Sequence, residues 1–138
     1  MIRNLLLLFF SVSIFYTANA QESDYQLVEK TLNYYMDGGT NNDFNTLKKA
    51  FHETATMKYI TKEGYKEVNA LEFFSGMDAS KPKSNRKTRI ADITISGHAA
   101  NARLELEYKD FTFVDFMNLL KVDGEWKIVS KIFYKRME

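Results

Sequence analysis

The residues best suited to acid–base chemistry in this sequence are its two histidines, because an imidazole ring titrates near neutral pH. His98 lies at an expected turn and is predicted to face solvent, which leaves His52 as the candidate general base. A His–Asp pair would need Asp43, Asp92 or Asp115 beside the ring, and strand alternation predicts that Asp115 points outward. We favour a structural interpretation for His52, in which the ring hydrogen-bonds the last turn of the preceding helix and suits its dipole.

Other kinds of catalytic site lack their motifs in this sequence. The chain has no cysteine, and neither histidine shows the H-x-H or H-x-x-x-H spacing of metal ligands. There is no Gly-rich phosphate loop and no G-x-S-x-G nucleophile turn. The sequence therefore predicts neither a metal nor a cofactor.

Residues 1–20 have the three parts of a secretory signal peptide. Arg3 supplies the positive start, residues 5–16 are almost all apolar, and Ala18 and Ala20 form an A-x-A cleavage site before Gln21. The apolar run is shorter than the ~20 residues that a spanning helix needs, so no membrane segment is expected after cleavage. We expect export to the periplasm or the medium, with residues 21–138 as one domain whose N-terminal sequence would begin at Gln21.

The charge of the exported part argues against nucleic acid as a partner. Arg3 is the only charged residue of the leader, so the formal net charge of +1 for the full chain falls to zero without it. Residues 81–89 contain a run of lysines and arginines, but no aromatic residues alternate with them. We interpret this run as a solvated loop in preference to a site for anions or lipid headgroups.

The periodicity of the chain predicts helices first and strands afterwards. Ser23 and Gln26 form a capping box before an apolar helical stripe over 23–39, and a second helix is expected over 43–51. A hairpin follows over 55–68, with a short helix over 69–77. Four strands are then predicted, over 88–97, 98–110, 111–122 and 125–135, the last two joined by an Asp-Gly turn. This order predicts an α+β fold with helices on one face of an antiparallel sheet.

The strand over 111–122 is apolar on both faces, which raises the question of what covers its outer side. We expect Phe116, Asn118, Leu120 and Val122 to point inward, together with Trp126, Ile128, Ser130, Ile132 and Tyr134 of the next strand, whose Lys131 would point outward. The outer face would then carry Phe113, Met117 and Leu119. Because long apolar patches usually mark interfaces, we predict a homodimer through this face; the alternative is a loop or terminus that covers it.

The order of elements and several local motifs resemble the NTF2-like superfamily. The motifs are a tyrosine-bearing first helix, G-x-x-x-D over 39–43, L-x-x-x-F over 47–51 and A-T-M over 55–57. The segment "FVDFMNLLKVDGEWKIVSKIFY" is similar to the SnoaL-like and "putative lumazine-binding" branch. The resemblance implies a cone, in which a strongly bent antiparallel sheet wraps three N-terminal helices around a mostly apolar pocket. Relatives use that pocket for catalysis, ligand binding or association.

The resemblance also allows a test for isomerase chemistry. In isomerases of this superfamily the base is a carboxylate on the strand after the second helix, where this chain has Tyr59. An oxyanion-binding acid lies on the penultimate strand, where alignment places Asn118, and the helical tyrosine has a counterpart in Tyr34 or Tyr35. A phenol is a poor base at neutral pH, and an amide cannot transfer a proton. The motifs therefore do not support that activity.

The sequence as a whole predicts an exported, non-catalytic domain that binds a small, planar aromatic ligand between aromatic walls. An isomerase, dehydratase or cyclase with His52 as base and a tyrosine as acid is one alternative, and a homodimeric association module is another. The residues expected to line the pocket are Tyr35, Phe51, Tyr59, Phe74, Tyr108, Asn118 and Trp126.

Overall fold

The computed structural model describes residues 22–138, so the predicted signal peptide lies outside the described residues. Helix α1 (Asp24–Asn41) begins at the Ser23–Gln26 capping box and ends at Asn42, whose φ of 55° is left-handed. Two short helices follow, α2 (Phe44–Leu47) and α3 (Ala70–Phe74). None of the described helices has the length and hydropathy needed to span a membrane.

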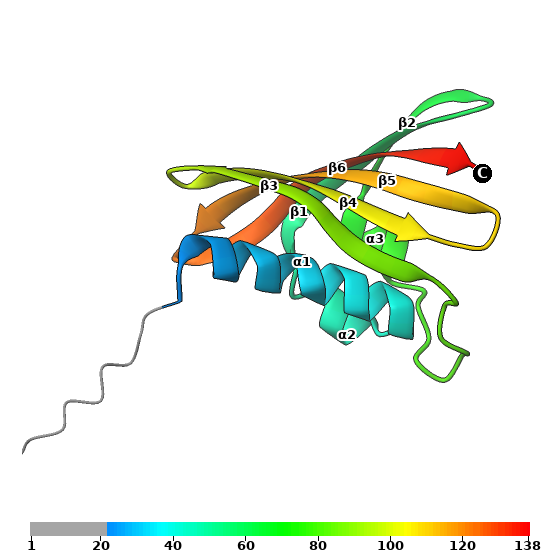
Figure 1. Ribbon diagram of the computed structural model, residues 1–138, viewed down its shortest axis with the longest axis horizontal. Helices are drawn as coiled ribbons and strands as arrows, with labels where there is room; N and C mark the ends of the chain where they lie inside the picture. Colours follow the sequence, from blue (N-terminus) through cyan, green and yellow to red (C-terminus); the bar gives the residue numbers. More distant parts are fainter. Residues whose placement is uncertain (1–21) are drawn as a thin grey trace, which may run out of the picture.

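Six strands form one sheet in the order β2-β1-β6-β5-β4-β3. Their bounds are β1 (Phe51–Thr61), β2 (Gly64–Asn69), β3 (Lys87–Ser96), β4 (Ala99–Glu107), β5 (Phe111–Val122) and β6 (Glu125–Met137). Neighbouring strands are antiparallel except for β1 and β6, which run parallel, so the sheet is mixed. All three helices lie on the same side of the sheet, with α1 across its bent inner face (Figure 1). The predicted α+β architecture is confirmed.

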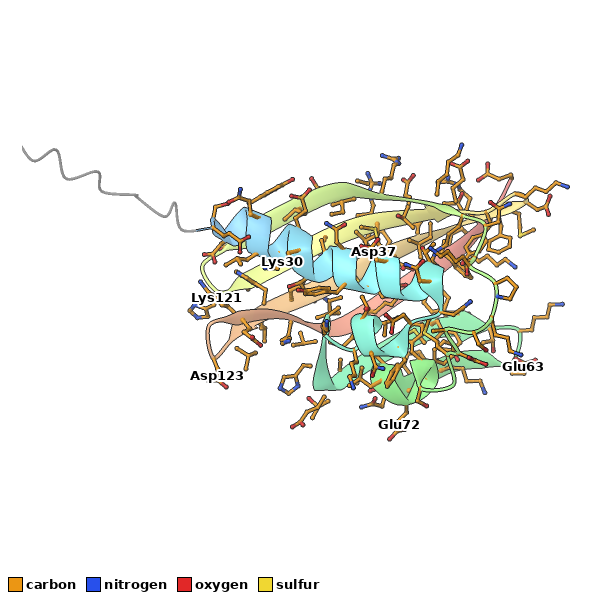
Figure 2. The ribbon with its side chains drawn as sticks, turned by 90° about the horizontal axis from the view of Figure 1, so that it is seen from below. Lys30, Asp37, Glu63, Glu72, Lys121 and Asp123 are labelled. Carbon is orange, nitrogen blue, oxygen red and sulfur yellow. The ribbon has the colours of Figure 1, made fainter. Side chains whose placement is uncertain are left out.

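The core lies between α1 and the inner face of the sheet. Helix α1 buries Val28, Leu32, Tyr35 and Met36, which recur at helical spacing. Strand β4 buries alternate residues with the predicted facing, through Ala100, Ala102, Leu104 and Leu106. The start of α1 is held against the β5–β6 hairpin, because Asp24 accepts hydrogen bonds from Lys121 Nζ and Trp126 Nε1 at 2.8 and 3.0 Å. Figure 2 shows Lys121 and Asp123 at this end of the molecule.

The predicted facing of β5 is wrong, and that of β6 is wrong beyond its first residues. Asp115, Met117 and Leu119 are buried on the inner face, whereas Phe116 and Leu120 are exposed. Lys131 is buried as well, although the sequence pattern predicted that it points outward. The three residues proposed for the dimer interface therefore face the helices: Phe113 packs against the core, and Met117 and Leu119 belong to it.

A β-bulge in β6 explains why simple alternation failed there. Asn118 pairs with Ser130 and Leu119 pairs with Ile128, so Val129 is an extra residue without a partner on β5. An extra residue moves all later side chains of the strand to the opposite face. Ile128 therefore points inward as predicted, while beyond the bulge Lys131 takes the inner position and Ile132 the outer one.

The second helix is shorter than predicted because the chain enters β1 early. Helix α2 ends at Leu47, and β1 already begins at Phe51. Tight contact between helices α1 and α2 holds this connection: a Cβ added at Gly38 would lie 2.5 Å from the backbone nitrogen of Leu47. Glycine is therefore required at residue 38 for close approach of two backbones.

We predict that Gly38→Ala lowers the free energy of unfolding by about 2 kcal/mol, because backbone atoms of Leu47 cannot yield as a flexible side chain can. Gly76→Ala is the matched control, since a Cβ there meets nothing within 4 Å and its φ is not positive. Urea unfolding of both variants measures the difference. Equal stability of the two variants would contradict the packing argument.

Candidate functional site

A cavity of about 170 Å³ lies between α1, α3 and the inner face of the sheet. Aromatic rings form most of its wall, and three charged side chains reach it from β5, β6 and the segment before β3. This mixture of apolar walls with a few converging polar groups is typical of small-molecule sites. The lining residues are Tyr35, Met57, Phe73, Phe74, Arg86, Leu106, Tyr108, Phe113, Asp115, Lys131 and Phe133.

A buried ion pair with a tyrosine forms the polar floor of the cavity. Lys131 Nζ lies 2.9 Å from Asp115 Oδ1, and the two side chains are 5% and 0% exposed. The Tyr35 hydroxyl donates a 2.7 Å hydrogen bond to Asp115 Oδ2. The pair exists because Lys131 and Met117 are cross-strand partners, which puts Asp115 diagonally opposite the lysine on the same face.

The second oxygen of this carboxylate depends on the lysine. Asp115 Oδ1 is buried, and the ammonium of Lys131, 2.9 Å away, is the partner found for it within residues 22–138. The Tyr35 hydroxyl holds the other oxygen, Oδ2. A charge buried in this way is costly once its counter-ion is removed, so the carboxylate and the ammonium stabilise each other at the cavity floor.

Burial shifts the pKa values of the two neighbours of Asp115. Burial raises the pKa of Tyr35 well above its usual 10.0, and the charge and hydrogen bond of Asp115 raise it further. Tyr35 is therefore a neutral donor across the neutral range. Burial lowers the pKa of Lys131 below 10.5, although the attraction of Asp115 opposes that shift.

Arg86 brings a second cation to the cavity and anchors the loop before β3. Its Nε donates to Thr40 Oγ1 at 3.0 Å, Nη2 to the Met36 carbonyl at 3.1 Å, and Nη1 to the Tyr108 hydroxyl at 2.9 Å. None of the ion pairs found within residues 22–138 includes Arg86. Glycine at residue 39 makes room for the Arg86 guanidinium, since a Cβ at that residue would lie 2.5 Å from Arg86 Nη2.

The aromatic walls consist of two groups of rings, one around Tyr35 and one around Phe113. Tyr35 meets Phe51 and Phe74 edge-on, at centroid distances of 5.7 and 6.1 Å. On the sheet side, Phe113 packs edge-on against Phe133 and Tyr108 at 5.6 and 6.0 Å. Such contacts fix ring orientation, so the cavity between the groups is held open by rigid side chains.

The residues predicted to line the pocket fall into three groups. Tyr35, Phe74 and Tyr108 line the cavity, and Phe51 supports its wall through both Tyr35 and Phe74. Tyr59 stacks on Phe133 at 5.0 Å and borders a separate groove. Asn118 lies on the outer sheet face, where its side chain hydrogen-bonds with those of Asn101 and Ser130. Trp126 lines a different cavity, near the start of α1.

His52 lies outside the cavity, in β1. Its Nδ1 lies 2.8 Å from Thr54 Oγ1 and accepts the backbone N–H of Thr54 at 3.2 Å. The predicted bond to the last turn of the preceding helix is therefore replaced by a local contact within the strand. The ring does not meet Tyr35 or Asp115, so the proposed His52–tyrosine pair is not formed.

Sequence reasoning missed Asp115, Lys131 and Arg86. One available signal was the charge itself, since Asp115 and Lys131 interrupt two neighbouring strands that are otherwise apolar near them. Arg86 carried no such signal, because it lies within a run of exposed basic residues. No group of three histidine, aspartate or glutamate side chains within residues 22–138 is placed to hold a metal ion.

Known proteins with this fold support the architecture. An NTF2-like protein of unknown function from Shewanella baltica is 33% identical, with a TM-score of 0.73 over 81% of this chain and 93% of that chain. An NTF2-like protein of unknown function from Methylobacillus flagellatus is 29% identical, with a TM-score of 0.72 over 86% of this chain and 96% of that chain. Among curated proteins, the aldolase FrzH of a Cladobotryum species is 25% identical over 114 residues, which cover 81% of this chain and 91% of the relative.

The family model described as "putative lumazine-binding" matches residues 23–134, from the cap of α1 nearly to the end of β6. The resemblance expected from the helical tyrosines and the C-terminal strands is thereby confirmed. The chain belongs to the putative lumazine-binding family, with the NTF2-like fold.

Proposed function

We propose that this protein binds a small, planar molecule in the cavity above the Tyr35–Asp115–Lys131 cluster. The observation that carries the proposal is the buried cluster of a carboxylate, an ammonium and a phenol at the floor of an aromatic-walled cavity. Apolar walls with a few converging polar groups are typical of small-molecule sites. The family name points in the same direction.

The donor and acceptor pattern of the cavity defines the chemistry of the ligand. Among the charged groups that line the cavity, the Asp115 carboxylate is an acceptor, whereas Lys131 and Arg86 are donors, so the ligand carries an N–H or O–H group and a carbonyl or anionic oxygen. The rings of Phe74, Phe113 and Tyr108 suit a flat apolar surface between those groups. A planar heterocycle with N–H and C=O groups on its edge meets all of these requirements.

Catalysis at the same site is a second candidate function, and two observations favour it. The cavity contains a carboxylate, an amine and a phenol in contact, which are groups able to move protons. One relative is named an aldolase, and aldol chemistry requires proton removal next to a carbonyl group. In this alternative Asp115 takes the role of base that the sequence pattern assigned to His52.

Association of two copies through the outer sheet face is a third candidate. Phe116 and Ile132 are directly opposed on β5 and β6 and are 38% and 49% exposed. They border an apolar depression of about 280 Å³ that also includes Ile60, Tyr65 and Tyr134. A second copy of this chain is the partner we propose, because a two-fold axis lets the same patch cover itself. Export through the predicted signal peptide remains part of the proposal.

We predict that Phe73→Ala weakens binding of a planar heterocycle about five- to tenfold, because aromatic contacts contribute about 0.5–1.5 kcal/mol. A thermal-shift screen of such heterocycles identifies the ligand, and calorimetry then compares the variants. Tyr65→Ala is the matched control: its ring is 59% exposed against 54% for Phe73, but it lies outside the cavity. Failure of every heterocycle to stabilise the protein would remove the support for this function.

We predict a distinct pH dependence for Tyr35→Phe. Tyr35 has a raised pKa in the folded protein, so above pH 10 only the unfolded chain loses this proton, and folded stability falls as the pH rises. The wild type should therefore lose about 1.4 kcal/mol more than the variant between pH 9 and pH 11. Urea unfolding at both values measures this loss. Tyr25→Phe, at an exposed position, should lose as much stability between these pH values as the wild type. A loss in Tyr35→Phe equal to that of the wild type would contradict the burial argument.

We predict that Phe116→Lys combined with Ile132→Lys converts a dimer to a monomer in sedimentation velocity, because two charges per copy would be desolvated in the interface. Thr94→Lys adds a charge at an exposed position of β3 and should leave the dimer intact. A wild type that sediments as a monomer at all concentrations would exclude this association. Circular dichroism checks that the variants remain folded.

A further inference from the structure

We propose that Lys131 forms a Schiff base with an aldehyde or ketone that enters the cavity. Of the residues found to line the cavity, Lys131 is the only one with an amine. The proposal rests on the proposed function in one respect, that the cavity admits small molecules, and it adds a covalent step and a class of ligand.

The surroundings of Lys131 differ from those of a surface lysine. Its side chain is 5% exposed, and Nζ lies 4.0 Å from the ring centroid of Phe133 and 5.8 Å from that of Tyr35. An amine in such a pocket gives up its proton more readily, which is how lysines become nucleophiles near neutral pH. The charged and titratable groups that face it are Asp115, Tyr35 and Arg86; Asp115 favours the ammonium form, while burial and Arg86 oppose it.

Asp115 is placed to handle the protons of the reaction. The Lys131 ammonium gives a proton to the carboxylate 2.9 Å away, and the freed amine forms the C–N bond with the carbonyl carbon. The second N–H proton moves to the former carbonyl oxygen, which gives a carbinolamine. Its C–O bond then breaks, and the proton held by Asp115 leaves with the hydroxyl group as water. One carbonyl compound and one ammonium thus become one iminium ion and one water, with no oxidant or reductant.

The charges of the cavity are the same before and after this reaction. The iminium ion carries the single positive charge that the ammonium carried, beside the same Asp115 carboxylate. The Phe133 ring faces that charge in both states, and cations are attracted to ring faces. Tyr35 keeps the carboxylate oriented through its 2.7 Å hydrogen bond to Oδ2. Because no new charge is buried, the covalent product fits the existing electrostatics.

The reaction can be trapped directly. The full chain, incubated at pH 7 with benzaldehyde and sodium cyanoborohydride, should acquire a stable benzyl group on the lysine that forms an imine. We expect initial labelling of Lys131 to be severalfold faster than that of Lys127, since burial lowers the pKa of Lys131 and so raises the fraction of free amine. Lys127 is the matched comparison on the same strand, with a more exposed side chain that contacts Glu125. Peptide mapping by mass spectrometry reads both sites in one sample.

Variants and pH separate this reaction from general lysine labelling. Lys131→Arg keeps a cation beside Asp115 but removes the amine, so the fast labelling should disappear. In Lys127→Arg the fast labelling of Lys131 should remain. Fast labelling of Lys131 should also persist to lower pH than labelling of exposed lysines. Labelling of Lys131 at or below the rate of Lys127 in the wild type would overturn the proposal, and that result does not depend on the folding of any variant.

The two proposals about the cavity fail in different ways. If heterocycles stabilise the protein without reductant while Lys131 stays unlabelled, the Schiff base is wrong and ligand binding stands. If no heterocycle binds while Lys131 is labelled fast, the ligand class is wrong and the reactive amine stands.

Discussion

The ion pair between Asp115 and Lys131 is the constraint on which the rest of the molecule depends. Two opposite charges removed from water lose several kcal/mol of hydration each, which is recovered only with close contact and satisfied neighbours. The contact requires both side chains on the inner sheet face, and the bulge at Val129 puts Lys131 there. The Tyr35 hydroxyl and the Phe133 ring complete the surroundings of the pair, so α1 and β6 are positioned by polar as well as apolar contacts.

Most of the fold could be predicted from local patterns, whereas the cavity floor could not. Capping at Ser23, the turn at 123–124 and the alternation of β4 are local signals, and each one was present in the structure. Strand β5 has apolar residues on both faces, so alternation alone could not show which face meets the helices, and the facing that was predicted placed Asp115 outward. Asp115 is buried because its partner Lys131 lies on another strand, beyond a bulge that no local pattern indicates. Tyr35, Phe74 and Tyr108, which were predicted as aromatic wall residues, line the cavity.

The inner and outer faces of the sheet present different chemistry to their surroundings. The inner face combines rigid rings with three charged groups in a small volume, which suits selective recognition of one compact molecule. The outer face is broad and apolar near Phe116 and Ile132, which suits a flat protein surface. Adjacent residues on β5 and β6 serve the two faces in turn, so a substitution at one face leaves the chemistry of the other largely intact.

The position of β6 between β1 and β5 has a consequence for how the chain acquires its structure. Because β6 lies between strands that precede it in the chain, the two halves of the sheet cannot join before β6 has been made. The cavity floor needs Lys131, which lies on the same strand. Closing the sheet and building the cavity floor are therefore one event in folding.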